Sequence, residues 1–316
     1  MTAAAVAAKA AAIRRHSRVD VAMWGGLVPS SVSDLDAMAE AGVVGFKAFA
    51  CPSGWDDFPP VDEPALAAGM AAGARLNLPV AVHCELATLG HTVASEVEAV
   101  RWAARLAAPA GAWLHVVHTS AVEAVDEARK WPRVSVETCP HYLFLDDELA
   151  RRTGAWAHCH PPIRDTANRD RLWDRLHSHA IDTIASDHSP CPAALKEGPN
   201  PRAGVDGVGV ALPLLVSDGR LSLPDIARVT TSAARLLQLP GKGSLAPGAD
   251  ADLVLVDPAS SWVVGPETTW SRHRLSPFIG WTLNARVVRT PVRGLTVYCD
   301  KEGPLSPGHG RFVRPI

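Results

Sequence analysis

Short apolar, β-branched runs alternate along the chain with longer segments rich in Ala, Leu, Glu and Arg. The short runs predict strands at residues 19–24, 43–49, 80–83, 113–118, 134–138 and 183–186. The segments between them predict helices at 33–41, 64–76, 95–106, 121–130 and 169–177. Strands that alternate with helices in this way are typical of βαβ units and a parallel sheet. Six such strands predict a (β/α) barrel or most of one. An open doubly wound sheet is the rival, and the absence of Gly-x-Gly-x-x-Gly after the first strand weakens it.

The two ends of the chain differ from this pattern. Residues 1–15 are rich in Ala and predict a helix that begins at Met1 without a cap residue. They do not resemble a signal peptide, because Lys9 interrupts the apolar run. Residues 221–239 predict the last helix. From Gly241 the chain becomes turn-rich and strand-like, with two short strands around 291–294. We therefore divide it into a barrel part, 1–240, and a small β-rich appendage, 241–316.

Length and composition fit one large α/β domain with an appendage. The chain has 316 residues, of which 47% are apolar and 20% charged, enough for a sizeable core. Its 31 basic and 33 acidic residues give a net charge of −2, which argues against nucleic-acid or polybasic membrane partners. No stretch of about 18 apolar residues suggests a membrane span. The six scattered Cys, without Cys-x-x-Cys, predict free thiols in a reducing compartment, and hence a cytoplasmic location.

Three side chains with chemical potential lie in or at the ends of predicted strands. Lys47 interrupts an apolar strand; either it reaches water, or it is a reactive amine of lowered pKa that takes up CO2 as a carbamate. His83 and His118 end successive strands. Either histidine alone could be a core residue, but the C-terminal strand ends of a barrel meet at one face. We expect both to approach Lys47, and His115 to face the opposite side, against a helix.

A carboxylate follows the last predicted strand. Asp187 either caps the next segment or, beside the two histidines and the lysine, acts as a metal ligand and proton shuttle. Nitrogen and oxygen donors at one rim suit zinc or a similar divalent ion. Two further polar clusters, ETCPHYL and CHPPIRD, either orient a polar heterocycle or stabilise loops; they contain Glu137, Cys139, His141 and Arg164.

Together these segments resemble the cyclic amidohydrolases: dihydroorotase, hydantoinase and, most closely, allantoinase. The resemblance runs over nearly the whole chain and is carried by WGGLVPSSVSDLDAMAEAGVVGFKAFACPSG, VHCE, HVVHTSA, ETCPHYL, PPIRD, SDHSPCP, KGSLAPGADADLVLVDP and RLSPFIGWTLNARVVRTPVRG. It implies a distorted (β/α)8 TIM-type barrel with two zinc ions. In that family Lys47 would be carboxylated and bridge the metals, His83 and His118 would bind the second metal, and Asp187 would bind the first and act as general base. A metal-activated hydroxide would open a cyclic ureide, allantoin, to allantoate.

The chain departs from this family at its start. Members carry a His-x-His pair at the end of the first barrel strand, whereas His16 stands alone here, and the pairs at 158–160 and 177–179 lie in the wrong units. Aligned on the family, Met1 falls inside the helix before the third strand, so the first two strands and half of the appendage are absent. We therefore expect an N-terminally truncated barrel, one zinc bound by three donors, and impaired hydrolysis. Open sheet edges would favour a homo-oligomer.

Substrate contacts and activity leave alternatives open. His160 stands where the family has a small residue beside the substrate. The resemblance places it with Cys139, His141 and Arg164 as substrate-binding residues. Loss of the His-x-His pair favours a non-catalytic, dihydroorotase-like scaffold, whereas the retained polar donors, which are costly to bury, favour an enzyme. Hydantoinase- or dihydroorotase-like specificity is the third alternative.

Overall fold

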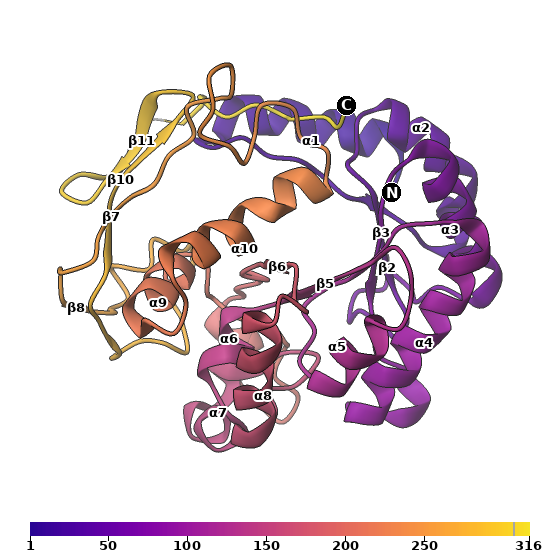
Figure 1. Cartoon of the computed structure of the whole chain (residues 1–316), viewed down its shortest axis with the longest axis horizontal. Helices are drawn as coiled ribbons and strands as arrows, with labels where there is room; N and C mark the ends of the chain where they lie inside the picture. The colour runs from indigo at the N-terminus through magenta and orange to yellow at the C-terminus, as the bar shows by residue number, and fades with distance from the viewer. Residues whose placement is uncertain (306) are drawn as a thin grey trace.

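The computed structural model describes residues 1–305 and 307–316, and one parallel six-stranded sheet forms its centre (Figure 1). The strands are β1 (Gly25–Gly26), β2 (Phe46–Phe49), β3 (Val80–His83), β4 (Leu114–Val116), β5 (Val134–Thr138) and β6 (Thr183–Ile184). Their order in the sheet is their order in the chain. Each connection therefore returns to the next neighbouring strand, as in a barrel.

Helices surround this sheet. They are α1 (Ala3–His16), α2 (Leu35–Glu40), α3 (Glu63–Leu76), α4 (Val93–Ala110), α5 (Val122–Ala128), α6 (Pro140–Phe144), α7 (Asp147–Thr153), α8 (Thr166–His177), α9 (Ala211–Asp218) and α10 (Leu223–Leu236). Short 3-10 turns lie at Pro29–Asp34, Ala87–Leu89, Gly154–Ala157 and Ala193–Leu195. In Figure 1, α2 to α5 follow one another around the outside of β1 to β5. The predicted helices 64–76, 95–106 and 169–177 correspond to α3, α4 and α8.

Helix α4 shows how local sequence sets these elements. The Thr92 side chain accepts a hydrogen bond from the Ser95 amide and caps the first turn. Gly111 ends the helix in the left-handed conformation that favours glycine. Between them, Ala and Val side chains form a buried face toward the sheet. Burial of this face, rather than helix propensity alone, stabilises the helix.

The two faces of the sheet carry different side chains. Phe46 is in register with Val80, Leu114 and Val134, and all four are buried in the apolar core beneath the outer helices. Lys47, one residue later, is in register with Ala81, His115 and Ser135 on the other face. Because successive strand residues point to opposite faces, the inner face is the polar one.

The expected position of His115 is wrong. It lies in register with Lys47, on the face opposite to α3, α4 and α5, and does not pack against a helix. Its Nδ1 lies 2.9 Å from Ser135 Oγ, and its ring stacks on Trp24 with centroids 6.3 Å apart. The hydroxyl on the next strand explains how a buried imidazole is tolerated there.

Two expectations at the N-terminus are also corrected. Helix α1 does have a cap, because Thr2 Oγ1 accepts a hydrogen bond from the Ala5 amide. The first strand occupies Gly25–Gly26 rather than 19–24. A Cβ at Gly26 would lie 2.3 Å from the Met1 side chain, which would have to move to accommodate a larger residue. Val21, in the predicted strand, instead forms a bridge with Phe312 near the C-terminus.

The C-terminal part is β-rich, as expected. An antiparallel sheet has the order β12-β11-β10-β7, and β8 pairs with β9. These strands are β7 (Leu255–Asp257), β8 (Trp262–Val263), β9 (Thr282–Leu283), β10 (Arg286–Val292), β11 (Leu295–Cys299) and β12 (Gly303–Pro304). Arg293 and Gly294, both at positive φ, form the two-residue hairpin between β10 and β11. The division at residue 240 stays a prediction.

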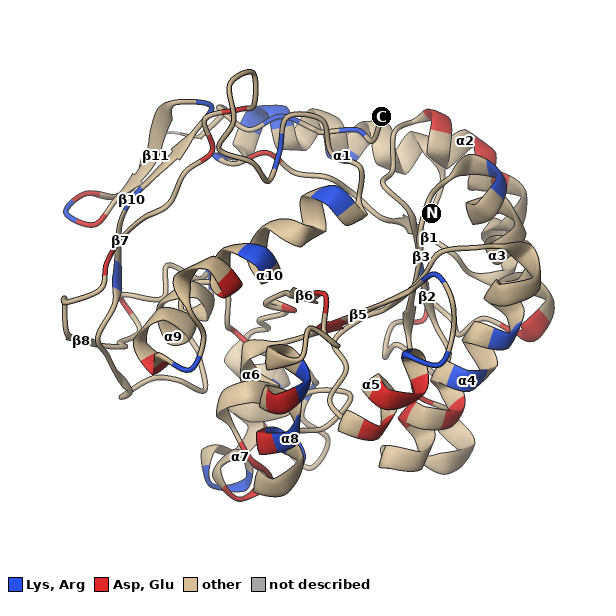
Figure 2. Ribbon diagram, viewed as in Figure 1, with Lys and Arg blue, Asp and Glu red and all other residues tan. Residues whose placement is uncertain are grey.

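A partly buried ion cluster connects the segment after α1 to the C-terminal part. Lys242 Nζ lies 2.5 Å from Asp20 and 2.6 Å from Asp252, and Arg293 also pairs with Asp20. Elsewhere, acidic and basic side chains are interspersed over helices such as α4 and α8 (Figure 2). Among the described residues, no helix combines the length and apolar character that crossing a bilayer requires.

Candidate active site

Two buried histidines meet at the carboxyl ends of β3 and β4. His83 is the last residue of β3, and His118 lies two residues beyond β4 in a left-handed conformation, φ 39°. His83 Nδ1 lies 3.1 Å from His118 Nε2, while His118 Nδ1 has no hydrogen-bond partner among the described residues. Burial lowers the pKa of both rings well below the ordinary value. Both imidazoles are therefore neutral at neutral pH, the form that binds metals.

Lys47 lies beside this pair. Its Nζ sits 3.8 Å from the centroid of the Phe49 ring, which stacks on the His83 ring at 5.0 Å. The ammonium donates a hydrogen bond to the Ala48 carbonyl at 3.0 Å. Burial lowers the Lys47 pKa to about 8, which supports the reactive amine over a charge held in water.

The Asp187 carboxyl lies close enough to Lys47 for each group to shift the pKa of the other. It lies three residues beyond β6, in a left-handed conformation, φ 41°. Burial, together with the nearby Glu137 carboxylate, raises its pKa to about 6, although Lys47 acts in the opposite direction. The next helical turn begins only at Ala193, so Asp187 is not a helix cap. A carboxyl group with this pKa can accept and return a proton near neutral pH.

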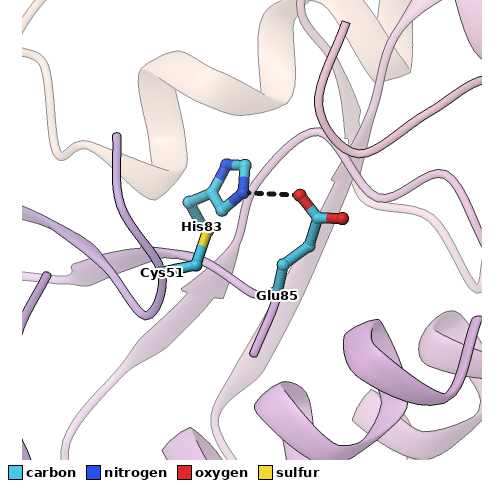
Figure 3. Close-up of side chains that lie close together, drawn as sticks. All are labelled: Cys51, His83 and Glu85. Carbon is cyan, nitrogen blue, oxygen red and sulfur yellow. Dashed lines mark hydrogen bonds and ion pairs between the residues drawn. The ribbon is translucent and has the colours of Figure 1, made fainter. Parts of the chain in front are cut away.

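The sequence reasoning missed two donors beside His83. Figure 3 shows Cys51, His83 and Glu85, whose donor atoms all lie within 4.8 Å of one another. Glu85 Oε2 is 2.9 Å from His83 Nε2, and all three side chains are buried. Glu85 could have been found, because residues two apart continue on the same face of an extended chain. Cys51 carries no such signal, and burial raises its thiol pKa to about 11.

A cavity of about 600 Å³ opens beside this cluster. Its lining includes Cys51, Glu85 and His160, together with Trp55 and Arg202. The Arg202 guanidinium lies 4.0 Å from the Trp55 ring centroid. Apolar walls with a few convergent polar groups and this volume suit a small, polar ring compound.

The other predicted substrate residues lie apart from this cavity or are engaged by protein. Arg164 donates to Ser120 Oγ at 3.0 Å, to the His91 carbonyl at 2.8 Å and to Glu96 at 2.6 Å. The loop-stabilising alternative therefore describes Arg164, since it anchors the segment after His118. Cys139 and His141 are buried around the start of α6 and are not among the residues that line the cavity.

The donor set fits a divalent transition metal. Two neutral imidazoles and an amine of lowered pKa lie together near the carboxyl ends of the strands, where barrel enzymes carry their active sites, and the Asp187 carboxyl is close enough to Lys47 to raise the lysine pKa. Histidine nitrogens and carboxylate oxygens are common zinc ligands. The unpartnered Nδ1 of buried His118 is a further sign of an unmet ligand. Their roles as metal ligands stay predictions.

Residues 33–297 match the model of the Amidohydrolase family. The chain belongs to this family. This amidohydrolase is 41% identical to an allantoinase of Solibacter usitatus (strain Ellin6076), over 99% of the chain and 75% of the relative. It is 38% identical to an allantoinase of Rubrobacter xylanophilus, over 97% and 75% of the two chains. An allantoinase of Escherichia coli (strain K12) is 35% identical, over 93% and 73%.

Solved structures confirm the amidohydrolase barrel fold. An L-hydantoinase (dihydropyrimidinase) from Arthrobacter aurescens superposes with a TM-score of 0.93 at 29% identity, covering 99% of this chain and 78% of that one. A D-hydantoinase from Thermus sp. gives a TM-score of 0.84 at 26% identity, covering 95% and 74%. This amidohydrolase thus spans about three quarters of the length of these relatives.

Proposed function

We propose that this amidohydrolase opens a cyclic ureide by hydrolysis, with allantoin as substrate and allantoate as product. The observation that carries the proposal is the buried contact between His83 and His118 beside Lys47, at the carboxyl ends of the strands. Relatives named allantoinase, 35–41% identical over nearly the whole chain, support this substrate. Hydantoin is the second candidate, because solved hydantoinases share the fold.

The cation we propose is zinc, held by His83, His118, Asp187 and the carboxylated form of Lys47. With a pKa of about 8, about a tenth of Lys47 amines are neutral at pH 7, against about one in three thousand for an ordinary lysine. The neutral amine adds to the carbon of CO2, loses a proton and becomes an anionic carbamate. A bound zinc ion would act as a Lewis acid that activates water and polarises a carbonyl.

The proton transfers fall to Asp187. The ionised carboxylate accepts a proton from the attacking water as the bond from oxygen to the ring carbonyl carbon forms. It returns this proton to the ring nitrogen as the carbon–nitrogen bond breaks, so the carboxylate is regenerated. Its pKa of about 6 suits both directions of transfer near neutral pH. The cavity lined by Trp55, Glu85 and Arg202 is the space we propose for the ring.

Turnover of three ring compounds tests this proposal. The purified chain is supplied with zinc and bicarbonate and assayed with allantoin, hydantoin and dihydroorotate, with Asp187→Asn as the matched control. We expect allantoin to be the best substrate, at a rate below that of the relatives, because residues 1–46 hold no His-x-His pair. Asp187→Asn should lower the rate by about 100-fold or more. A preference for hydantoin would show that hydantoin, not allantoin, is the substrate. Turnover no higher than that of the control would contradict the proposed hydrolysis and favour the non-catalytic scaffold.

Two further expectations accompany this proposal. All six cysteines of the chain are free thiols, which supports a reducing and hence cytoplasmic environment. A homo-oligomer stays a prediction, motivated by the edge strand β1, which pairs only with β2 in the described sheet. Light scattering on the purified chain measures its mass directly.

A further inference from the structure

A second group of metal-binding side chains lies at the cavity, next to the histidine pair. The donor atoms of Glu85, His91 and His160 all lie within 4.8 Å of one another. The His91 and His160 rings stack with centroids 3.9 Å apart. His160 Nδ1 is buried and has no hydrogen-bond partner among the described residues. All three side chains line the cavity of about 600 Å³.

Glu85 joins this group to the first one. Its Oε2 lies 2.9 Å from His83 Nε2, and its Oε1 lies 3.0 Å from His91 Nδ1. The carboxylate is almost fully buried, with 1% of its side chain exposed. The two oxygens of this buried carboxylate are thus directed at different imidazoles, one in each group.

The donors belong to separate parts of the chain. Glu85 follows β3, His91 precedes α4, and His160 belongs to the loop before α8. The His-x-His pair at 158–160 does not follow the first barrel strand, where the family carries such a pair. One of its two histidines, His160, nevertheless lies at the site. Its partner, His158, lies with its ring centroid 5.0 Å from that of His160 and does not line the cavity.

We propose that Glu85, His91 and His160 form a second site for a divalent transition metal such as zinc. Two imidazoles and one carboxylate are the protein ligands of several catalytic zinc sites, which leave one coordination position for water or substrate. The cavity that all three side chains line provides space for such a water or substrate. The site differs from the predicted His83 and His118 site and uses neither of these histidines. The site lies in the cavity that we propose for the substrate, but metal binding there does not require that the chain hydrolyse allantoin.

Zinc binding by the full chain tests this site. The chain is stripped of metal with a chelator, and zinc binding is measured by calorimetry and by elemental analysis after dialysis. The variants are His91→Ala/His160→Ala, the single variant His91→Ala, and His179→Ala as control. His179 is an exposed histidine outside both groups, and its side chain is 60% exposed. Circular dichroism verifies that each variant is folded; His91 has a 53% exposed side chain, so its replacement leaves the core intact.

We expect His91→Ala/His160→Ala to lose one zinc ion per chain relative to the wild type, and His179→Ala to lose none. In His91→Ala alone, affinity at this site should fall by more than about 100-fold, since loss of even an outer hydrogen-bond partner costs about 10–100-fold. An unchanged zinc count and affinity in both variants would overturn the proposal, as would a wild type that binds no zinc. Failure of the proposed function is separate: it would leave allantoin unhydrolysed whatever the zinc count.

Discussion

The ion pair between Glu96 and Arg164 should stabilise the site far more than a surface pair of the same length. Both this pair and Arg75–Asp36 have a nitrogen–oxygen distance of 2.6 Å. In the first pair, the side chain of Arg164 is 12% exposed and that of Glu96 2%. In the second pair, both side chains are about 60% exposed. Burial is therefore the main difference between them.

Arg164→Ala should lower the free energy of unfolding by about 3–5 kcal/mol, because it leaves the Glu96 carboxylate buried without its cation. Burial already raises the Glu96 pKa with the arginine present. Arg75→Ala should cost about 0–1 kcal/mol, since water screens both charges. Arg164 also donates to Ser120 Oγ, so its loss should loosen the segment that follows His118.

Urea unfolding at pH 7, followed by the fluorescence of the ten tryptophans, measures both changes in metal-free buffer. At about 2.1 cal/mol/K of unfolding entropy per residue, a loss of 4 kcal/mol corresponds to a melting temperature lower by about 6 °C. Arg75→Ala should shift it by less than about 2 °C. A difference between the two variants below about 1 kcal/mol would refute the argument that burial sets the strength of these pairs.

Three other predictions follow from the same structure. Leu114→Ala, in fully buried β4, should lower the free energy of unfolding by about 2–5 kcal/mol in urea titrations, whereas a loss under about 1 kcal/mol would mean that the sheet is not packed as described. The hydrogen bond from Arg101 lowers the pKa of Glu127 to about 2, so the stabilisation from this carboxylate is complete above about pH 4.5 and is lost as the pH falls toward 2. The urea midpoint of Glu127→Gln should therefore fall less between pH 7 and pH 3 than that of the wild type. An equal fall in both proteins would contradict this. A chelator should abolish allantoin hydrolysis, and added zinc should restore it. Hydrolysis by the metal-free chain would contradict a metal-dependent reaction.

Much of the fold follows from local pattern. The strands 80–83 and 134–138 were predicted with the boundaries that the structure has, because short runs rich in β-branched residues between helical segments are typical of strands. The first strand was misplaced, because two glycines carry no hydrophobic signal. Gly25–Gly26 form β1 by pairing with Phe46 and Lys47 of β2, which only the assembled structure reveals. The Thr2 cap was missed, although threonine just before an Ala-rich helix is a local signal.

The site was less accessible to sequence reasoning. His83 and His118 could be placed together, since both follow strands and the barrel brings strand ends to one face. The face of His115 could not, because its hydrogen bond to Ser135 depends on the register between β4 and β5. The approach of His91 to His160 depends on two loops, and loops carry no periodic signal.

The most direct test of the metal site is anomalous X-ray scattering at the zinc edge from crystals of the zinc-loaded chain. Our account predicts an anomalous peak about 2.0–2.1 Å from one ring nitrogen of His83 and one of His118. It would be contradicted by crystals in which these two imidazoles stay in contact with each other, 3.1 Å apart, while zinc binds elsewhere or is absent.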